Sequence, residues 1–584
     1  MASVKSTPMS GEDRRVIFAS SLGTIFEWYD FYLYGALAAI IGEQFFSALD
    51  ESSAFIFALL AFSAGFVVRP FGALVFGRLG VLVGRKSTFL ITIVIMGLST
   101  FIVGILPGYA SIGVAAPVIL IGLRLMQGLA MGGEYGGAVI YVAEHAPRNR
   151  RGVFTAWIQT TASLGLLLAL VVIWGTRSLM GEALFADWGW RIPFLASILM
   201  LGITIYIRIG LGESPVFTQM KARGAGSKAP VAEAFGRWSN LKKVLVALFG
   251  LTAGQAVIWY TGHFYALFFL TQSLGVDEAT AIVLMAVSLA LGSPFFVVFG
   301  ALSDRVGRKP IILAGCLLAT FTYMPVFDAL TQAANPALHA AQRSAKVTIY
   351  ADPSECSFQF NLTDAQKFAS SCDIAKRRLA SASVSYSHIA LSSGAPSLVT
   401  VGSTVVKVKH DPQDISIAKA EAVARLQRTG KVAPVDAQSK QDDAFLALSN
   451  ESAASTALFH IKLAQALREA GYPEKADMQA LSKFKVVLIL TYLVLLVTMV
   501  YGPMAAMLVE LFPTRIRYTS MSLPYHIGNG WFGGLLPATV FAIVAETGNS
   551  YSGLWYPIAV AGATVVVGAI LLRETKDVDL GVGR

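Results

Sequence analysis

Carboxylate side chains stand inside two apolar stretches of this sequence, where they are candidates for proton exchange. Glu27 and Asp30 lie three residues apart in the first stretch, and Glu134 lies among glycines in a later one. An ionisable group costs about 2.5–3.5 kcal/mol at the centre of a bilayer, so each one is a functional candidate. Because a buried carboxyl group can exchange a proton near neutral pH, we expect proton coupling by Asp30, with Glu134 and Glu27 as further candidates. The alternatives are a permanent ion pair for Asp30 and a packing role for Glu134.

Arg124 is the basic counterpart of these carboxylates, in the same apolar stretch as Glu134. A guanidinium stays charged in a protein, so inside an apolar bundle it requires a carboxylate partner. We expect this partner to be Asp30 at rest and an anionic substrate in the loaded protein. Competition for one arginine would then link proton occupancy to substrate occupancy.

Aromatic and polar residues in four apolar stretches, some of them at helical spacing, are candidates for lining a substrate cavity. A histidine inside a membrane can titrate at physiological pH, although hydrogen bonding is the alternative for His263 and simple packing for the others. The expected substrate-binding residues are Arg124, Gln127, Tyr34, Trp259, Tyr260, His263, His526 and Asn529.

Two short motifs occur twice in the chain. Residues 77–86 recur as 300–309, and the pattern Glu-x-x-Pro-x-x-x-Arg occurs at 144–151 and at 510–517. The two motifs lie 67 residues apart in the first copy and 210 in the second, a surplus of 143 residues. Such repetition predicts two homologous halves, the second with an insert. The repeated loops are expected to latch neighbouring helices through Gly77, Val81, Arg85, Asp304, Arg308, Glu144, Arg151, Glu510 and Arg517.

Hydropathy predicts an all-α membrane protein. The chain is 55% hydrophobic and 14% charged, and twelve segments reach the length of about 20 residues that a helix needs to cross a bilayer. They are 17–42, 54–76, 88–106, 113–143, 152–174, 190–211, 243–271, 280–301, 310–328, 484–511, 519–547 and 552–572. The expected domains are a six-helix half at 1–211, a linker at 212–242, spans seven to nine at 243–329, an insert at 330–482, and the last three spans with a tail at 483–584.

Lysine and arginine gather in the connections on one side of the predicted spans, as at Lys86, Arg150, Lys242 and Lys309. This asymmetry predicts that both termini lie in the cytoplasm and the insert outside it. The net charge of +10 is therefore attributed to topology, and no nucleic-acid partner is expected.

The insert at 330–482 lacks the hydrophobic character of the remaining chain and is expected to be a small α+β domain. Residues 347–350, 357–361 and 399–409 alternate as strands do, and 415–428 and 457–470 are typical of amphipathic helices. Cys356 and Cys372 are expected to form a disulfide outside the cytoplasm, with two unpaired thiols as the alternative. The insert is either a tolerated surface insertion or a lid or docking module.

These motifs together resemble the major facilitator superfamily and, within it, the metabolite/proton symporter family of bacteria. The resemblance rests on the repeated loops, on Glu27-Trp28-Tyr29-Asp30-Phe31, on Gly189-Trp190-Arg191-Ile192-Pro193-Phe194 and on Phe512-Pro513-Thr514-Arg515. It covers the chain outside 330–482 and implies two six-helix halves, alternating access and proton-driven uptake of organic acids or of zwitterions such as proline and betaine. Two features depart from the family. One is the insert, and the other is Val81, which stands where the first loop normally has an aspartate and predicts a less favoured outward-facing state.

The expected function is proton-coupled import of a small organic acid or zwitterion across a bacterial inner membrane. Efflux, facilitated diffusion, and a sensor or assembly role for the outer domain are the alternatives. The sequence lacks a phosphate-binding Gly-Lys-Ser loop and a metal-ligand cluster, so we expect no enzyme activity, no cofactor and no metal. The expected partners are a small-molecule substrate, protons and the lipid bilayer; an outer partner of the insert is not specified.

Overall fold

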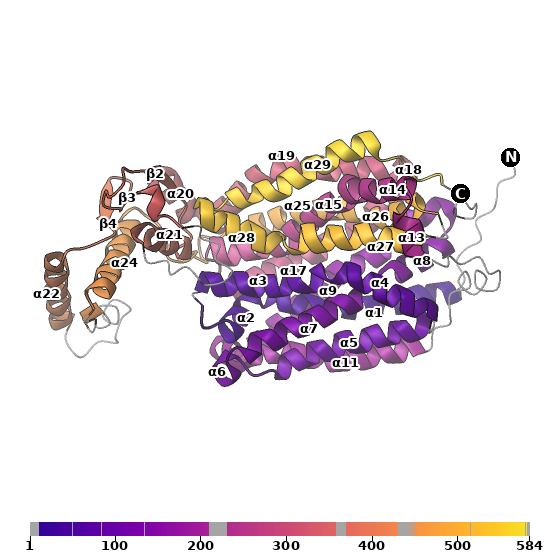
Figure 1. Cartoon of the computed structure of the whole chain (residues 1–584), viewed down its shortest axis with the longest axis horizontal. Helices are drawn as coiled ribbons and strands as arrows, with labels where there is room; N and C mark the ends of the chain where they lie inside the picture. Colours follow the sequence, from indigo (N-terminus) through magenta and orange to yellow (C-terminus); the bar gives the residue numbers. More distant parts are fainter. Residues whose placement is uncertain are drawn as a thin grey trace.

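A computed structural model describes residues 11–49, 51–82, 85–133, 135–209, 230–357, 370–429, 445–446, 448, 450–513, 516–578 and 580. Most of them lie in an elongated bundle of helices, with a smaller unit of helices and strands at the end opposite α13 and α14 (Figure 1). Among the described residues, nine helices are long and apolar enough to cross a membrane, or ten if the bent pair Glu182–Gly189 and Arg191–Tyr206 is one span. The number of twelve spans stays a prediction.

The first half of the bundle is formed by residues up to 209. Its helices are α1 (Gly11–Ala36), α2 (Ala38–Phe45), α3 (Glu51–Val67), α4 (Arg69–Leu82), α5 (Arg85–Ile105), α6 (Tyr109–Ile112), α7 (Ala115–Gly132), α8 (Tyr135–His145), η1 (Arg148–Arg150), α9 (Arg151–Met180), α10 (Glu182–Leu184), η2 (Phe185–Gly189) and α11 (Arg191–Ile209). Glycines bring α3 and α4 against the backbone of α7, because a Cβ atom at Gly128 would overlap the carbonyl of Gly65 and one at Gly72 would overlap that of Leu129. This close approach positions the start of α4 beside α7.

The second half contains several π-helical turns, which are frequent at functional sites. Its helices are α13 (Pro230–Phe235), α14 (Trp238–Ala247), η3 (Leu248–Thr252), α15 (Ala253–Tyr260), η4 (Thr261–Tyr265), α16 (Ala266–Phe268), η5 (Phe269–Ser273), α17 (Glu278–Gly292), α18 (Pro294–Val306), α19 (Arg308–Ala334), α25 (Lys483–Tyr501), α26 (Met504–Leu511), α27 (Arg517–Ile527), η7 (Gly528–Gly534), α28 (Leu536–Thr547), η8 (Ser552–Leu554) and α29 (Trp555–Leu571). The elements from α14 to η5 follow one another directly and form one candidate span, Trp238–Ser273.

The insert contains a four-stranded sheet in the order β2-β1-β3-β4. Strand β1 pairs in parallel with β2 and antiparallel with β3, which forms a hairpin with β4. The elements are α20 (Pro336–Ser344), β1 (Val347–Ala351), η6 (Pro353–Glu355), α21 (Ser371–Ser381), β2 (Tyr386–Ala390), β3 (Leu398–Val401), β4 (Thr404–Lys407), α22 (Pro412–Thr429) and α24 (Glu451–Glu469).

The strands differ in part from the sequence-based expectation. A single strand over 399–409 is wrong: Gly402, with φ of +57°, turns the chain between β3 and β4. Strand β2 was not expected, because four of its five residues are exposed and leave little alternation. Residues 358–361 of the expected strand 357–361 lie outside the described residues.

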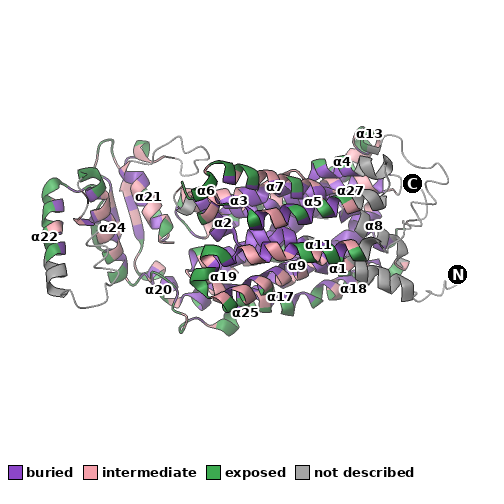
Figure 2. Ribbon diagram, turned by 90° about the horizontal axis from the view of Figure 1, so that it is seen from below, coloured by how far each residue is buried: buried purple, intermediate pink, exposed green. Residues whose placement is uncertain are grey.

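The insert rests on the second half of the bundle. The backbone N–H of Tyr386 donates to the carbonyl of Gly548 at 2.8 Å, and Lys376 pairs with Glu546 at 3.7 Å. The two ends of the insert lie side by side at the bundle. The backbone N–H of Ser482 donates to the carbonyl of Ala333 at 2.9 Å. Helix α22 stands farthest from the bundle, with much of its surface exposed (Figure 2).

Candidate functional site

Arg124 lies buried in the middle of α7, with 1% of its surface exposed. Its guanidinium donates to Gln127 Oε1 at 2.5 Å and to the carbonyl of Phe31 at 3.4 Å. It also lies over the rings of Phe31, at 4.3 Å from the ring centroid, and Tyr34, at 4.6 Å. The expected pairing with Asp30 is not formed, and among the described residues no carboxylate lies within ion-pair distance of Arg124.

Arg69, the first residue of α4, is a second buried arginine that the sequence analysis missed. It too is 1% exposed, and its guanidinium lies 4.4 Å from the centroid of Phe31 and 4.1 Å from that of Phe66. Nη2 donates to the sulfur of Met131 at 3.0 Å. No carboxylate among the residues that the structure describes pairs with it either. Arg69 lies inside the apolar segment 54–76. Arg124 was singled out as a charged residue inside an apolar segment, and the same reasoning could have identified Arg69.

Phe31 therefore lies between two buried guanidinium groups on neighbouring helices. Asp30, the preceding residue of α1, is also buried, with 5% of its surface exposed. Two fixed charges in an apolar interior are costly unless an anion compensates them. Of the other acidic candidates, Glu134 and the side chain of Glu27 lie outside the described part of the chain.

Next to the two arginines lies a row of aromatic side chains from both halves, which we call the aromatic wall. Tyr32 of α1 stacks on Trp259 of α15 at 5.2 Å between ring centroids, and Trp259 stacks on His263 at 4.3 Å. Tyr260 packs edge-on against Phe66 at 5.2 Å and so connects the wall to Arg69. These rings link the first and second halves at the middle of the bundle.

The three remaining polar candidates are buried in hydrogen-bonding or packing environments. His263 is held between Ser163 Oγ, 2.9 Å from its Nε2, and the carbonyl of Trp259, 3.0 Å from its Nδ1. Asn529 of η7 exchanges hydrogen bonds of 3.3 and 3.4 Å with Gln255. His526 packs edge-on against Tyr525, with 5.2 Å between the ring centroids.

At the end opposite the insert, a charged cluster closes the two halves against each other. Asp304 accepts hydrogen bonds from the backbone N–H groups of Gly152 at 2.8 Å and Val153 at 3.0 Å, in the first turn of α9. It also pairs with Arg308 at 2.7 Å, across the break at Gly307 between α18 and α19. Arg308 in turn pairs with Glu510 at 3.3 Å. We call these residues, together with Arg151, the latch.

Of the other candidates for the latch, two have contacts that the structure describes and four do not. Arg151 lies 3.6 Å from Glu510 and donates to the carbonyl of Val578 at 2.8 Å. Arg517 donates from Nε to the carbonyl of Phe512 at 3.1 Å and so fixes the start of α27. Four candidate residues of the first copy lie outside the described side chains: Gly77, Val81, Arg85 and Glu144.

Near the insert the halves also touch. Arg177 of α9 donates to Glu278 of α17 at 2.7 Å, and Phe55 packs against Phe268 at 5.5 Å between centroids. Phe55, Phe268 and Glu278 also line a cavity of about 360 Å³ between both halves and the insert, which contributes Ser383 and Lys475. The arginine site thus lies between contacts that join the halves at both ends.

Comparisons with known proteins agree with this architecture. Residues 16–234 match the family described as sugar (and other) transporter. The chain is 33% identical over 320 residues to the shikimate transporter of Escherichia coli K12, covering 54% of this chain and 72% of the relative. The chain belongs to the major facilitator superfamily.

Two further comparisons extend this membership. The proline/betaine transporter of Escherichia coli K12 is 37% identical over 328 residues, which cover 54% of this chain but only 65% of that transporter's length. The inner membrane metabolite transport protein YhjE of the same organism is 34% identical over 347 residues, covering 57% and 76%. The major facilitator fold itself is seen in a proton:xylose symporter structure with a TM-score of 0.57 over 97% of both chains, at 14% identity.

Proposed function

We propose that this chain is a proton-coupled secondary transporter that imports a small organic acid or zwitterionic metabolite by alternating access. The observation that carries the proposal is the pair of buried arginines, Arg69 and Arg124, which share Phe31 and pair with no carboxylate among the described residues. A substrate carboxylate supplies the missing anion, and an arginine fork is suited to bind it. Shikimate, proline and betaine, which are named for the relatives, all carry a carboxyl group.

Asp30 supplies the proton coupling in this proposal. In the proposed cycle, the ionised carboxylate partly offsets the positive charge of Arg69 and Arg124. Protonation removes that charge and leaves a more positive site, which attracts the substrate anion more strongly. Release of the proton on the other side restores the competing charge, so that substrate and proton leave together.

Alternating access requires the contacts at the two ends to open in turn. The latch formed by Asp304, Arg308 and Glu510 closes the end that we assign to the cytoplasm, because the basic connections lie there. The pair Arg177 and Glu278 with the nearby aromatic contacts closes the end beneath the insert. The proposal includes twelve spans in two halves, cytoplasmic termini and a periplasmic insert at 330–482 in a bacterial inner membrane.

A ligand screen on the purified protein tests the substrate site. A panel of carboxylates and zwitterions is added to the protein, and its thermal unfolding temperature is recorded. We expect a stabilising ligand to lose its effect in Arg69→Gln and Arg124→Gln and to keep it in Arg237→Gln, whose arginine is exposed. If binding survives in both buried variants, the arginines do not form the substrate site.

A further inference from the structure

The disulfide of the insert sits at a position suited to reaction. Cys356 and Cys372 are joined with 1.97 Å between their sulfurs, across a sequence separation of 16 residues. Cys356 follows β1 and η6, and Cys372 is the second residue of α21, the helix that connects the parallel strands β1 and β2. A cysteine pair beside a βαβ unit is typical of thioredoxin-like redox motifs, although two residues usually separate the cysteines there.

The two sulfurs differ in their accessibility. Cys356 is partly exposed, whereas Cys372 is fully buried. We therefore expect an incoming thiolate to attack Cys356 rather than Cys372. The sulfur that it displaces lies in the first turn of α21, an 11-residue helix capped by Ser370, and the N-terminus of a helix stabilises a thiolate.

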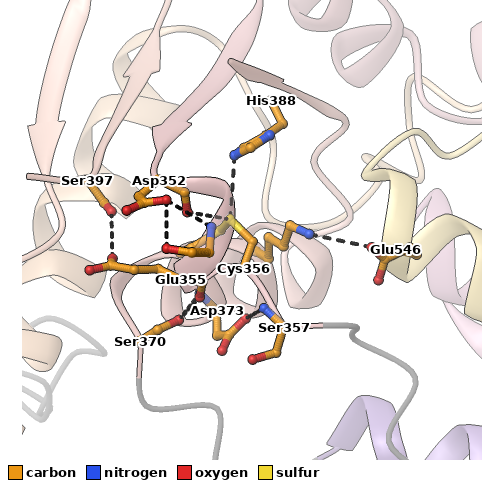
Figure 3. The surroundings of a disulfide bond; sticks show 12 residues. Asp352, Glu355, Cys356, Ser357, Ser370, Asp373, His388, Ser397 and Glu546 are labelled. Carbon is orange, nitrogen blue, oxygen red and sulfur yellow. Dashed lines mark hydrogen bonds and ion pairs between the residues drawn. A yellow bond between two sulfur atoms is a disulfide. The ribbon is translucent and has the colours of Figure 1, made fainter. Parts of the chain in front are cut away.

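A histidine stands beside the accessible sulfur. His388 Nε2 lies 3.5 Å from Cys356 Sγ, and His388 is exposed on strand β2 (Figure 3). Partial burial and then the charge of Lys376 lower the pKa of His388 from its ordinary value of 6.5. The imidazole is neutral at pH 7 and can accept the proton of an approaching thiol.

Hydrogen bonds also connect the two segments that carry the cysteines. The backbone N–H of Ser357 donates to Asp373 at 2.8 Å, and the Ser370 hydroxyl donates to the carbonyl of Glu355 at 2.5 Å. These two hydrogen bonds join the segment around Cys356 to the start of α21 without involving the sulfur atoms (Figure 3). The insert can therefore keep its structure when the disulfide opens, as a module that cycles between two redox states requires.

We propose that the insert is a thiol–disulfide exchange module in which Cys356 is the attacked sulfur and Cys372 is the leaving thiolate. A thiolate of an external dithiol attacks Cys356 Sγ, forms a mixed disulfide and releases Cys372 as a thiolate. The second thiol of the partner, deprotonated, then attacks its own sulfur in the mixed disulfide and releases Cys356. The partner leaves as a disulfide, and two electrons and two protons have passed from it to the two cysteines.

The rate of reduction tests the proposal on the unmodified full-length protein. The protein in lipid nanodiscs is mixed with dithiothreitol, quenched by alkylation and analysed by mass spectrometry. We expect the disulfide to be reduced about tenfold faster than oxidised glutathione under the same conditions, without a change in amide hydrogen exchange in the insert. Reduction that is slower than that of glutathione, or that unfolds the insert, would overturn the proposal. The assay needs no transport substrate, so its outcome is independent of the proposed transport.

Single-cysteine variants test the asymmetry of the two sulfurs. With oxidised glutathione, Cys372→Ser should trap a mixed disulfide on Cys356, and Cys356→Ser should trap none on Cys372. The buried Cys316 of α19 is an unreactive thiol within the same chain. His388→Asn should slow reduction by the dithiol about tenfold with unchanged hydrogen exchange. Equal trapping on both cysteines contradicts the assignment of the attacked sulfur, and an unchanged rate in His388→Asn removes the histidine from the mechanism.

Discussion

Asp304 Oδ1 accepts a hydrogen bond of 2.8 Å from the backbone N–H of Gly152, and this contact joins the second half of the bundle to the first. The N–H group belongs to the first turn of α9, where the helix dipole favours a negative charge. Gly152 is suited to this approach because a Cβ atom there would lie 2.6 Å from the Ser303 hydroxyl. The contact therefore couples the latch to the closed arrangement of the two halves.

Removal of the charge at Asp304 should loosen the latch. In Asp304→Asn the side chain keeps its shape but no longer compensates Arg308 or the start of α9. We expect a cysteine placed at the buried Thr155 to be labelled by a polar maleimide about tenfold faster in this variant. The exposed Asp411→Asn serves as the matched control, and labelling at the same rate in both would show that Asp304 does not hold the halves closed.

Restoring the missing carboxylate of the first repeat should have the opposite effect. Val81 occupies the position that corresponds to Asp304 in the second copy. In Val81→Asp a second carboxylate becomes available to hold the cytoplasmic end closed, so we expect slower labelling of the same cysteine from that side. A labelling rate indistinguishable from that of the parent chain would refute this role for the repeat.

Deletion of the insert should leave transport intact. Ala333 and Ser482 are already joined by a backbone hydrogen bond, so removal of 335–480 with a short linker preserves the pairing of α19 with α25. We expect proton-driven uptake to fall by no more than about threefold, since long surface insertions cost little. Uptake that is abolished at normal membrane levels would instead assign the insert a gating role.

The insert should become less stable on acidification because of His460 in α24. Burial, and then the charge of Arg378, lowers the pKa of His460 from 6.5 to about 4. The unfolded chain therefore binds a proton that the folded chain does not, so stability is complete above pH 6.5 and is lost as the pH falls towards 4. Proteolysis of the insert should increase about tenfold more between pH 7.5 and 5 in the parent chain than in His460→Gln. Identical pH profiles for the two chains would exclude His460 as the cause.

Much of the helical architecture could be predicted from local signals, whereas the arrangement of the site could not. Hydropathy predicted a helical membrane protein, and the repeated motifs predicted Asp304, Arg308 and Glu510 as latch residues, which the structure joins. The hairpin at Gly402 could have been foreseen from the glycine between two apolar runs. Its positive φ ends β3, a backbone property that alternation alone does not reveal.

The arginine site depends on contacts between distant segments. Arg124 was expected to pair with Asp30, but its guanidinium donates to Gln127 on the same helix and to a carbonyl of α1. Nothing in the sequence places Arg69 and Arg124 against one phenylalanine ring, because that depends on how closely α4 and α7 approach. The glycines that permit this approach, Gly65, Gly72 and Gly128, do not reveal which residue they bring against Phe31.

The coupling of transport to protons through Asp30 is the central claim, and uptake into reconstituted vesicles with an acidic exterior tests it most directly. The parent chain should accumulate the ligand found by thermal shift, and accumulation should collapse when the pH gradient is dissipated. Asp30→Asn should lose gradient-driven accumulation while it retains exchange of labelled for unlabelled substrate, and Asp411→Asn should behave like the parent chain. Undiminished proton-driven accumulation in Asp30→Asn would contradict the account.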